Sequence, residues 1–248
     1  MDMKKTIKPF KRPPKKYQPK GLTILYEDHD IVVVNKSAGL LTVRTEKIKE
    51  NTALNHLNSY VRKGNPKSNA RVFVVHRLDK DTSGVLIFAK SETAKSYLMD
   101  EWKNFSKTYY AIVDGILKEK EGVITSYLAE NSIHRMYSVN NPEKGAFAKT
   151  GYKVLKESKR YSLLEVKLHT GKKNQIRVHF AEKGFPVAGD KMYSKPAKGV
   201  KRLTLHSTSL TITHPYTNEP MTFESKIPEY FNTFFKSRSK NANGCNSI

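Results

Sequence analysis

Runs rich in β-branched and aromatic residues recur along the chain, each bounded by Gly, Asn, Asp or Pro. Such runs predict β-strands separated by turns. Helix candidates are fewer, and they do not alternate regularly with the strands. The pattern therefore predicts an α+β fold with a mixed sheet. The expected strands cover residues 22–27, 30–36, 71–75, 85–90, 109–115, 148–156, 161–168 and 203–214.

Three segments are expected to be helical. Residues 51–63 begin with Asn51 and residues 91–104 begin with Ser91, and both side chains favour the N-cap position. The third segment, residues 174–184, ends at Gly184, which suits a helix C-terminus. No repeat and no clear linker interrupts this order, so a single domain is expected.

The charge of the chain is unusually positive. It has 45 Lys and Arg against 23 Asp and Glu, a net charge of +22. Such a surface attracts polyanions, so RNA, DNA or an anionic membrane are candidate partners. The alternative is a very soluble basic protein.

The two ends of the chain differ from its middle. Residues 1–20 combine Lys and Arg with four prolines, and residues 233–248 are mostly polar. We expect a flexible basic arm and a polar C-terminal tail. The arm either holds nucleic-acid phosphates or serves as a solubilising tail. The domain between them is expected to cover residues 21–232.

Several features favour a cytoplasmic protein without a membrane span. Cys245 is the single cysteine, which excludes an internal disulfide and favours a reducing compartment. No apolar run approaches the roughly 20 residues of a membrane span. The basic N-terminus is not followed by the apolar segment of a signal peptide.

The segment RVFVVHRLDKDTSGVLIFAK places a charged loop, residues 76–84, between two apolar strands. Turn formation explains residues 81–84, because Asp, Thr and Ser side chains form hydrogen bonds with the backbone of a turn and Gly adopts the backbone conformations that a turn needs. It explains less well the dense charge at residues 76–80. Since loops held by rigid strands often carry catalytic groups, this loop is a candidate functional site. His76 is expected to orient the loop rather than act as a base.

This loop, HRLDKDTSG, resembles the HRLDxxTSG signature of the RluA-type pseudouridine synthases. Four further blocks resemble that family in the same order, and together they span residues 22–229. They read YEDHDIVVVNKSAGLLTV, KTYYAIVDG, TGKKNQIRVHFAEKGFPVAGDKMY and LHSTSLTITHP. The resemblance implies a single pseudouridine synthase catalytic domain with a mixed, largely antiparallel central sheet flanked by helices. The 20-residue arm is too short for the S4-type domain of many relatives.

The resemblance also implies the catalytic residues. Asp79 matches the family's essential aspartate, Arg177 its ion-pair partner, and Tyr109 its active-site tyrosine. An ionised Asp79 would add to C1′ of the ribose or remove a C2′ proton, and both routes remain open. A nearby cation would favour the charged carboxylate in a partly dry pocket. The alternatives are an RNA-facing or structural Arg177 and a core Tyr109.

Other residues are candidates for binding the substrate. In the family, the arginine of HRLD occupies the space vacated by a flipped base, and Arg77 matches it. Ile176 is expected to form an apolar pocket wall. Lys36 is a candidate contact to a phosphate or a carboxylate, and Lys172 to a phosphate. Either lysine is alternatively a solvated surface residue.

The resemblance implies an RNA uridine isomerase. Because pseudouridine is an isomer of uridine, no cofactor or metal is expected, and no GxGxxG, P-loop or His/Cys cluster stands out. The expected substrate is structured RNA, with ribosomal RNA favoured and transfer RNA as the alternative. The expected oligomeric state is a monomer. The rivals are a non-catalytic RNA-binding or assembly protein, a base-excising glycosylase and a nuclease.

Two positions depart from the family pattern. Ser37 stands where NKPAG has proline, and Asn174 stands where histidine usually precedes QIR. Ser37 loosens a turn without removing a reactive group. Asn174 still donates and accepts hydrogen bonds, so we expect it to change how the substrate or the neighbouring backbone is held.

Overall fold

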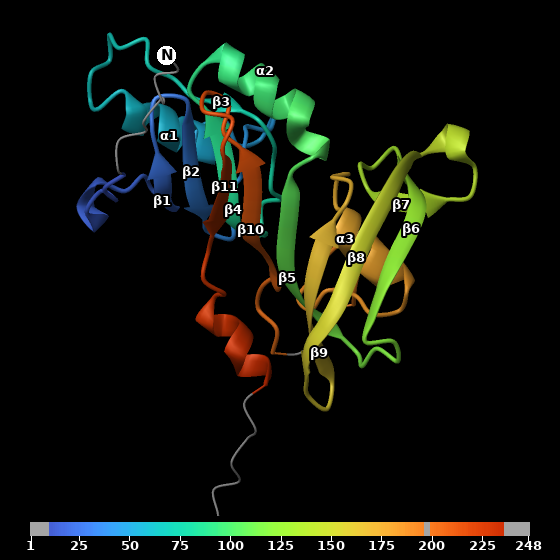
Figure 1. Ribbon diagram of the computed structural model, residues 1–248. Helices are drawn as coiled ribbons and strands as arrows, with labels where there is room; N and C mark the ends of the chain where they lie inside the picture. Colours follow the sequence, from blue (N-terminus) through green and yellow to red (C-terminus); the bar gives the residue numbers. More distant parts are fainter. Residues whose placement is uncertain (1–9, 196–198, 236–248) are drawn as a thin grey trace, which may run out of the picture.

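The computed structural model describes residues 10–195 and 199–235, which form one mixed sheet with helices on both faces (Figure 1). The strands follow the order β1-β2-β4-β10-β5-β9-β8-β6-β7, with β3 added to β4 and β11 to β10. Their bounds are β1 Leu22–Glu27, β2 Ile31–Lys36, β3 Phe73–Val74, β4 Ser83–Ala89, β5 Ser106–Asp114, β6 Glu121–Glu130, β7 Met136–Val139, β8 Ala146–Glu157, β9 Tyr161–Leu168, β10 Leu205–Thr213 and β11 Pro220–Glu224.

The apolar runs of β2 and β4 form the centre of the fold because both of their faces are covered. On one face, Val34 and Leu86 pack with Leu57 of α1. On the other face, Val33 and Ile87 belong to the cluster that includes α2. Strands buried on both faces read as continuous apolar runs rather than as an alternation, which explains these two segments.

The helices lie where their apolar residues meet the sheet. Helix α1, Ala53–Val61, and helix α3, Gln175–Glu182, contribute to the face that also holds the pocket described below. Helix α2, Glu92–Asp100, buries Ala94 and Leu98 on the opposite face. Short 3-10 helices complete the chain: η1 Lys15–Tyr17, η2 Glu101–Lys103, η3 Pro142–Lys144 and η4 Glu229–Phe234.

Strands β4 and β10 are parallel, whereas the other strand pairs in the described residues are antiparallel. Gly84 makes this junction possible. Its φ is +115°, and a Cβ there would lie 2.1 Å from the carbonyl oxygen of Ser207. Only glycine permits this backbone approach. The junction sets the start of β4, and therefore the loop before it, directly against β10.

The predicted fold class is confirmed, and Ser91 caps α2 as expected. Gly184 also ends α3, with φ of +83°. Other details were wrong. Thr52, not Asn51, caps α1, because its hydroxyl accepts a hydrogen bond from the Asn55 amide at 3.2 Å. The expected strand 71–75 is reduced to β3. Strands β6, β7 and β11 were missed.

The ends of the domain differ from the expected boundaries in part. Residues 1–9 and 236–248 of the expected arm and tail lie outside the described residues. From residue 10 onward the chain contacts the domain, with the Phe10 ring 5.5 Å from that of Tyr26. The expected boundary at residue 232 falls within η4, because Phe234 packs edge-on against Tyr161. Within the described ranges, no helix has the length and hydropathy of a membrane span.

Candidate active site

The loop that carries Asp79 runs between β3 and β4, and its backbone is held on both sides of that residue. The Thr42 hydroxyl accepts a hydrogen bond from the Leu78 amide at 3.2 Å and donates one to the Leu78 carbonyl at 2.8 Å. The Lys80 carbonyl accepts from the Gly39 amide at 2.8 Å and from the Lys36 ammonium at 3.1 Å. Asp79 therefore stands on a fixed backbone although it lies in a loop.

Lys36 is placed differently from the expected solvated turn residue and phosphate contact, and its ammonium contacts carbonyls rather than the carboxylate that was the third expectation. Its side chain is 0% exposed, so it is neither a solvated turn residue nor a phosphate contact. Its ammonium donates to the carbonyls of Ser37, Leu40 and Lys80 at 3.1, 2.7 and 3.1 Å. Burial lowers the pKa of Lys36 to about 7, and the charge of Asp79 opposes that shift. Lys36 supports the Asp79 loop from the interior of the protein, because its buried side chain reaches the Lys80 carbonyl.

His76 lies at the start of the loop, and its ring contacts the backbone of β4 and the ring of Trp102. Its Nε2 accepts a hydrogen bond from the Ile87 amide at 3.2 Å, and its ring stacks on Trp102 at 4.3 Å. Burial lowers the pKa of His76 to about 3, so the ring is neutral at physiological pH. These contacts fit the predicted role of orienting the loop.

Helix α3 brings Arg177 to the same place. The segment before the helix is held by Gln175, whose amide group donates to Lys149 and Thr150 and accepts from Thr170 and the Lys172 backbone. Asn174 begins the helix with φ of +53°, a left-handed conformation that Asn tolerates better than most residues. The first turn of α3 is therefore fastened to β8.

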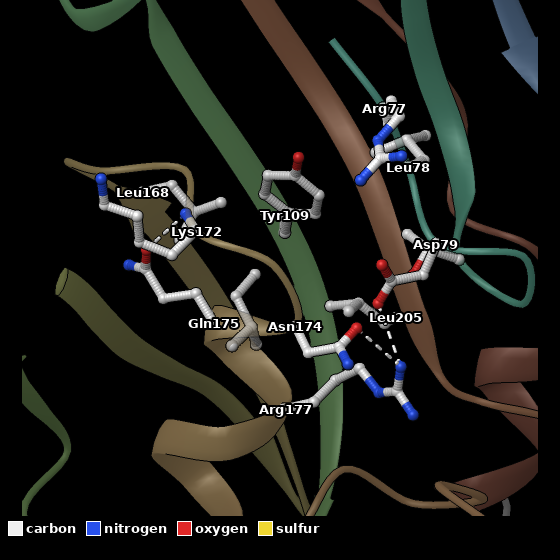
Figure 2. Close-up of a pocket in the computed structure, with 12 residues that line it drawn as sticks. Arg77, Leu78, Asp79, Tyr109, Leu168, Lys172, Asn174, Gln175, Arg177 and Leu205 are labelled. Carbon is white, nitrogen blue, oxygen red and sulfur yellow. Dashed lines mark hydrogen bonds and ion pairs between the residues drawn. The ribbon is translucent and has the colours of Figure 1, made fainter. Parts of the chain in front are cut away.

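Arg177 is bound by two carboxylates. Its Nη1 donates to Asp79 Oδ2 at 3.0 Å, so the ion pair implied by the family resemblance is present (Figure 2). Its Nε and Nη2 donate to Asp190 Oδ2 and Oδ1 at 2.7 and 2.9 Å. Nη1 also donates to Asn174 Oδ1 at 3.1 Å. Burial alone would lower the pKa of Arg177, but its hydrogen bonds and charge interactions with the carboxylates raise it.

Asp190 is a member of this site that the sequence analysis did not single out. Its side chain is fully buried, whereas that of Asp79 is 31% exposed. Burial would raise the pKa of Asp190, but hydrogen bonds and charge from Arg177 outweigh it and lower the pKa. The available signal was the GDKMY end of a recognised block, which reads equally well as a simple turn.

A pocket that opens to solvent lies beside the Asp79–Arg177 pair. Six of the seven predicted site residues line it, and Lys36 does not. The lining residues are Arg77, Leu78, Asp79, Thr82, Tyr109, Leu168, Lys172, Asn174, Gln175, Ile176, Arg177 and Leu205.

Tyr109 stands on β5 in the middle of the pocket, with Lys172 on one side and Arg77 on the other (Figure 2). Burial raises the pKa of Tyr109 to about 12, although a hydrogen bond with Ser207 opposes the shift. The phenol is therefore neutral at physiological pH. Arg77 and Lys172 are exposed, so the pocket has a basic mouth, and Asp79 is a partly exposed carboxylate in its lining.

One group of residues in the described ranges has the spacing of metal ligands: Asp28, Asp30 and His214. None of them lines the pocket. Asp28 already accepts hydrogen bonds from Tyr26 and His214 at 2.8 Å each. The group lies where the turn between β1 and β2 meets the end of β10, and hydrogen bonds already satisfy Asp28.

The arrangement of sheet and helices defines a pseudouridylate synthase fold. The structure titled human RNA Pseudouridylate Synthase Domain Containing 4 superposes with a TM-score of 0.71 at 23% identity, over 86% of this chain and 91% of that chain. The structure titled human RNA Pseudouridylate Synthase Domain Containing 1 gives 0.63 at 22% identity, over 91% and 98%.

The sequence comparisons lead to the family. Residues 30–182, more than half of the chain, match the family described as RNA pseudouridylate synthase. An uncharacterized RNA pseudouridine synthase of Bacillus subtilis, YhcT, is 37% identical over 84% of this chain and 69% of its own length. The ribosomal large subunit pseudouridine synthase D of Zymomonas mobilis is 31% identical over 87% and 72%. The chain belongs to this family and is an RNA pseudouridine synthase.

Proposed function

We propose that this enzyme isomerises uridines in large-subunit ribosomal RNA and that Asp79 is its catalytic group. The catalytic role of Asp79 is supported by the position of its carboxylate. It is held on a fixed backbone, is partly exposed to the pocket and is paired with Arg177 at 3.0 Å. A protein that only bound RNA would not need a carboxylate in the lining of a basic pocket.

The reaction requires that the glycosidic bond break and re-form. As the N1–C1′ bond breaks, its electron pair stays on uracil N1. Asp79 either bonds to C1′ or takes a C2′ proton to leave a glycal. The uracil then turns and C5 bonds to C1′, while the Asp79–C1′ bond breaks in the first route or Asp79 returns its proton to C2′ in the second. The C5 proton is then lost to solvent and N1 takes up a proton, so the product is an isomer of uridine and Asp79 is regenerated. Both routes require an ionised carboxylate, and the Arg177 guanidinium lies 3.0 Å from the Asp79 carboxylate.

The other lining residues suit a flipped uridine. Tyr109 offers an aromatic face for the uracil, and Ile176 and Leu205 offer apolar walls. Arg77 is exposed at the mouth, where its planar guanidinium suits stacking in the space that the base leaves. Lys172, exposed and in the pocket lining, is the proposed contact to an RNA phosphate.

The choice of ribosomal RNA is supported by relatives. Proteins named ribosomal large subunit pseudouridine synthase D from Zymomonas mobilis and Borreliella burgdorferi are 31% and 34% identical to this chain. The net charge of +22 suits a large polyanionic substrate. We further propose that the enzyme acts in the cytoplasm, where this substrate is made, and that it acts as a monomer.

The test uses RNA that carries tritium at uracil C5. Wild-type protein should release tritium and no free uracil, whereas Asp79→Asn should bind the RNA and release neither. Asp81→Asn is the matched control, because it removes an exposed carboxylate two residues away in the same loop. Tritium release by Asp79→Asn at the wild-type rate would exclude Asp79, and release of uracil would indicate a glycosylase. Transcripts of large-subunit ribosomal RNA and of transfer RNA, compared side by side, test the substrate.

A further inference from the structure

Arg177 is bound more extensively by Asp190 than by Asp79. Asp190 takes two parallel hydrogen bonds from the guanidinium, at Nε and Nη2. Asp79 takes one, at Nη1. A two-bond arginine–carboxylate pair fixes the plane of the guanidinium as well as its position. Asp190 therefore sets which edge of Arg177 faces the pocket.

Asp190 is itself held rigidly. Its Oδ1 accepts hydrogen bonds from the backbone amides of Met192 and Tyr193 at 2.9 and 3.1 Å. Gly189, just before it, has φ of +77°, and a Cβ there would lie 2.1 Å from the Arg202 carbonyl oxygen. The Ala188 amide donates to Ile112 of β5 at 2.8 Å. These contacts fix the segment around Asp190 to the sheet. Asp190 therefore has little freedom to move with Arg177.

The charges of the three side chains have a chemical consequence. Asp79 and Asp190 each carry −1 and Arg177 carries +1, so the group has a net charge of −1. With Asp190 absent, the group would be neutral and Arg177 would be free to grip both oxygens of Asp79. A carboxylate gripped in that way is a weaker nucleophile and a weaker base, because its lone pairs are engaged by the cation.

We propose that Asp190 is a positioning residue of the reaction: it orients Arg177 and shares its charge, so that Asp79 keeps one oxygen free for the ribose. This inference rests on the proposed function of Asp79. The rival interpretation is a buried ion pair that only stabilises the fold. The two differ in what happens to turnover once the RNA is bound.

The chain offers a matched pair for comparison. Arg160 donates to Asp114 through Nε at 2.8 Å and through Nη2 at 2.6 Å, the same two-bond geometry as Arg177 with Asp190. Asp114 does not line the pocket. Asp114→Asn therefore removes an arginine–carboxylate pair of the same hydrogen-bond geometry, although a more exposed one, away from the reacting groups.

The experiment measures single-turnover tritium release, RNA Kd and melting temperature for Asp190→Asn and Asp114→Asn. At saturating RNA, Asp190→Asn should slow release by about 10²-fold, the order expected when a catalytic group is displaced by about 1 Å. Its Kd should stay within about threefold of wild type, because the lost interaction acts in the transition state. Asp114→Asn should be within about twofold in both rate and Kd.

A second measurement on the wild-type protein covers the case in which Asp190→Asn fails to fold. In ¹⁵N-arginine-labelled protein, the Arg177 Nε–H, assigned with Arg177→Lys, should exchange slowly with solvent because Asp190 holds it. Any one of three results would overturn the inference. The first is tritium release at the wild-type rate by folded Asp190→Asn. The second is a slowing of tritium release in Asp114→Asn as large as that in Asp190→Asn. The third is rapid exchange of the Arg177 Nε–H of the wild-type protein with solvent. Activity in Asp79→Asn would instead overturn the proposed function, so the two failures are distinguishable.

Discussion

The ammonium of Lys36 donates a hydrogen bond to the carbonyl of Lys80, 44 positions later in the chain and next to Asp79. Two further carbonyls, those of Ser37 and Leu40, accept from the same nitrogen. One buried cation therefore joins the turn after β2 to the loop that carries the proposed catalytic group. Its charge is satisfied by backbone rather than by a carboxylate contact.

Replacement of Lys36 by methionine should lower the free energy of unfolding by about 2 kcal/mol, because three carbonyls lose their donor while one buried charge is removed. Urea unfolding monitored by circular dichroism measures the change. Lys80→Met is the control, since its exposed side chain takes no part in the contact and its carbonyl is retained. Equal stability of Lys36→Met and wild type would show that the ammonium does not hold the loop.

Asn174 is expected to contribute through both its backbone and its side chain. Alanine at its φ of +53° should cost about 1 kcal/mol of stability more than glycine, which adopts this conformation freely. Both variants lose the acceptor for Arg177 and the donor to the Tyr193 hydroxyl. Activity should therefore fall by a similar factor, about tenfold, in Asn174→Ala and Asn174→Gly, in line with one lost orienting hydrogen bond. A normal rate for Asn174→Gly would restrict the role of Asn174 to its backbone.

Stability should fall as the pH drops below neutrality because burial holds three histidines neutral, His76 among them. Burial lowers the pKa of His179 and of His206 from 6.5 to about 4. Between these values the unfolded chain binds protons that the folded chain does not, so stability rises with pH across this window and is lost as the pH falls. Each histidine contributes up to about 1.4 kcal/mol per pH unit.

Urea unfolding from pH 7 to pH 4.5 measures this dependence. His179→Asn should show a shallower decline than wild type, because one proton-linked site has been removed. His179 is hydrogen-bonded to Thr150 and Ser126, so the variant is also expected to be less stable at pH 7. A slope equal to that of wild type would contradict the prediction even if overall stability is lower.

RNA binding should weaken steeply with added salt, because phosphate contacts release counterions. Lys172→Met should weaken binding and reduce the slope of log K against log salt by about 1, the value for one phosphate contact. Lys120→Met is the control, since Lys120 is paired with Glu157 at 2.8 Å. Fluorescence anisotropy of labelled RNA at several salt concentrations gives both slopes. Identical slopes for Lys172→Met and wild type would remove Lys172 from the phosphate contacts.

The elements that could be predicted from sequence are those whose burial leaves a strong local pattern. Strands β2 and β4 read clearly because both faces are covered. Strand β6 was missed because apolar and polar residues mix along a half-exposed surface. Strand β3 was predicted too long, since apolar residues in 71–75 pack against the core outside a ladder. Strand order was not predicted, because a strand's own residues do not specify which distant strand lies beside it.

The sequence by itself determined the fold class, the loop that carries Asp79 and, through ordered motifs, the family and most of the pocket lining. Only the tertiary structure decided that Lys36 is buried behind the loop and that Asp190 shares Arg177 with Asp79. The reason is physical. Local pattern reports the burial and backbone preference of neighbouring residues, whereas the partner of a charged group depends on where the folded chain brings residues 13 or 98 positions away.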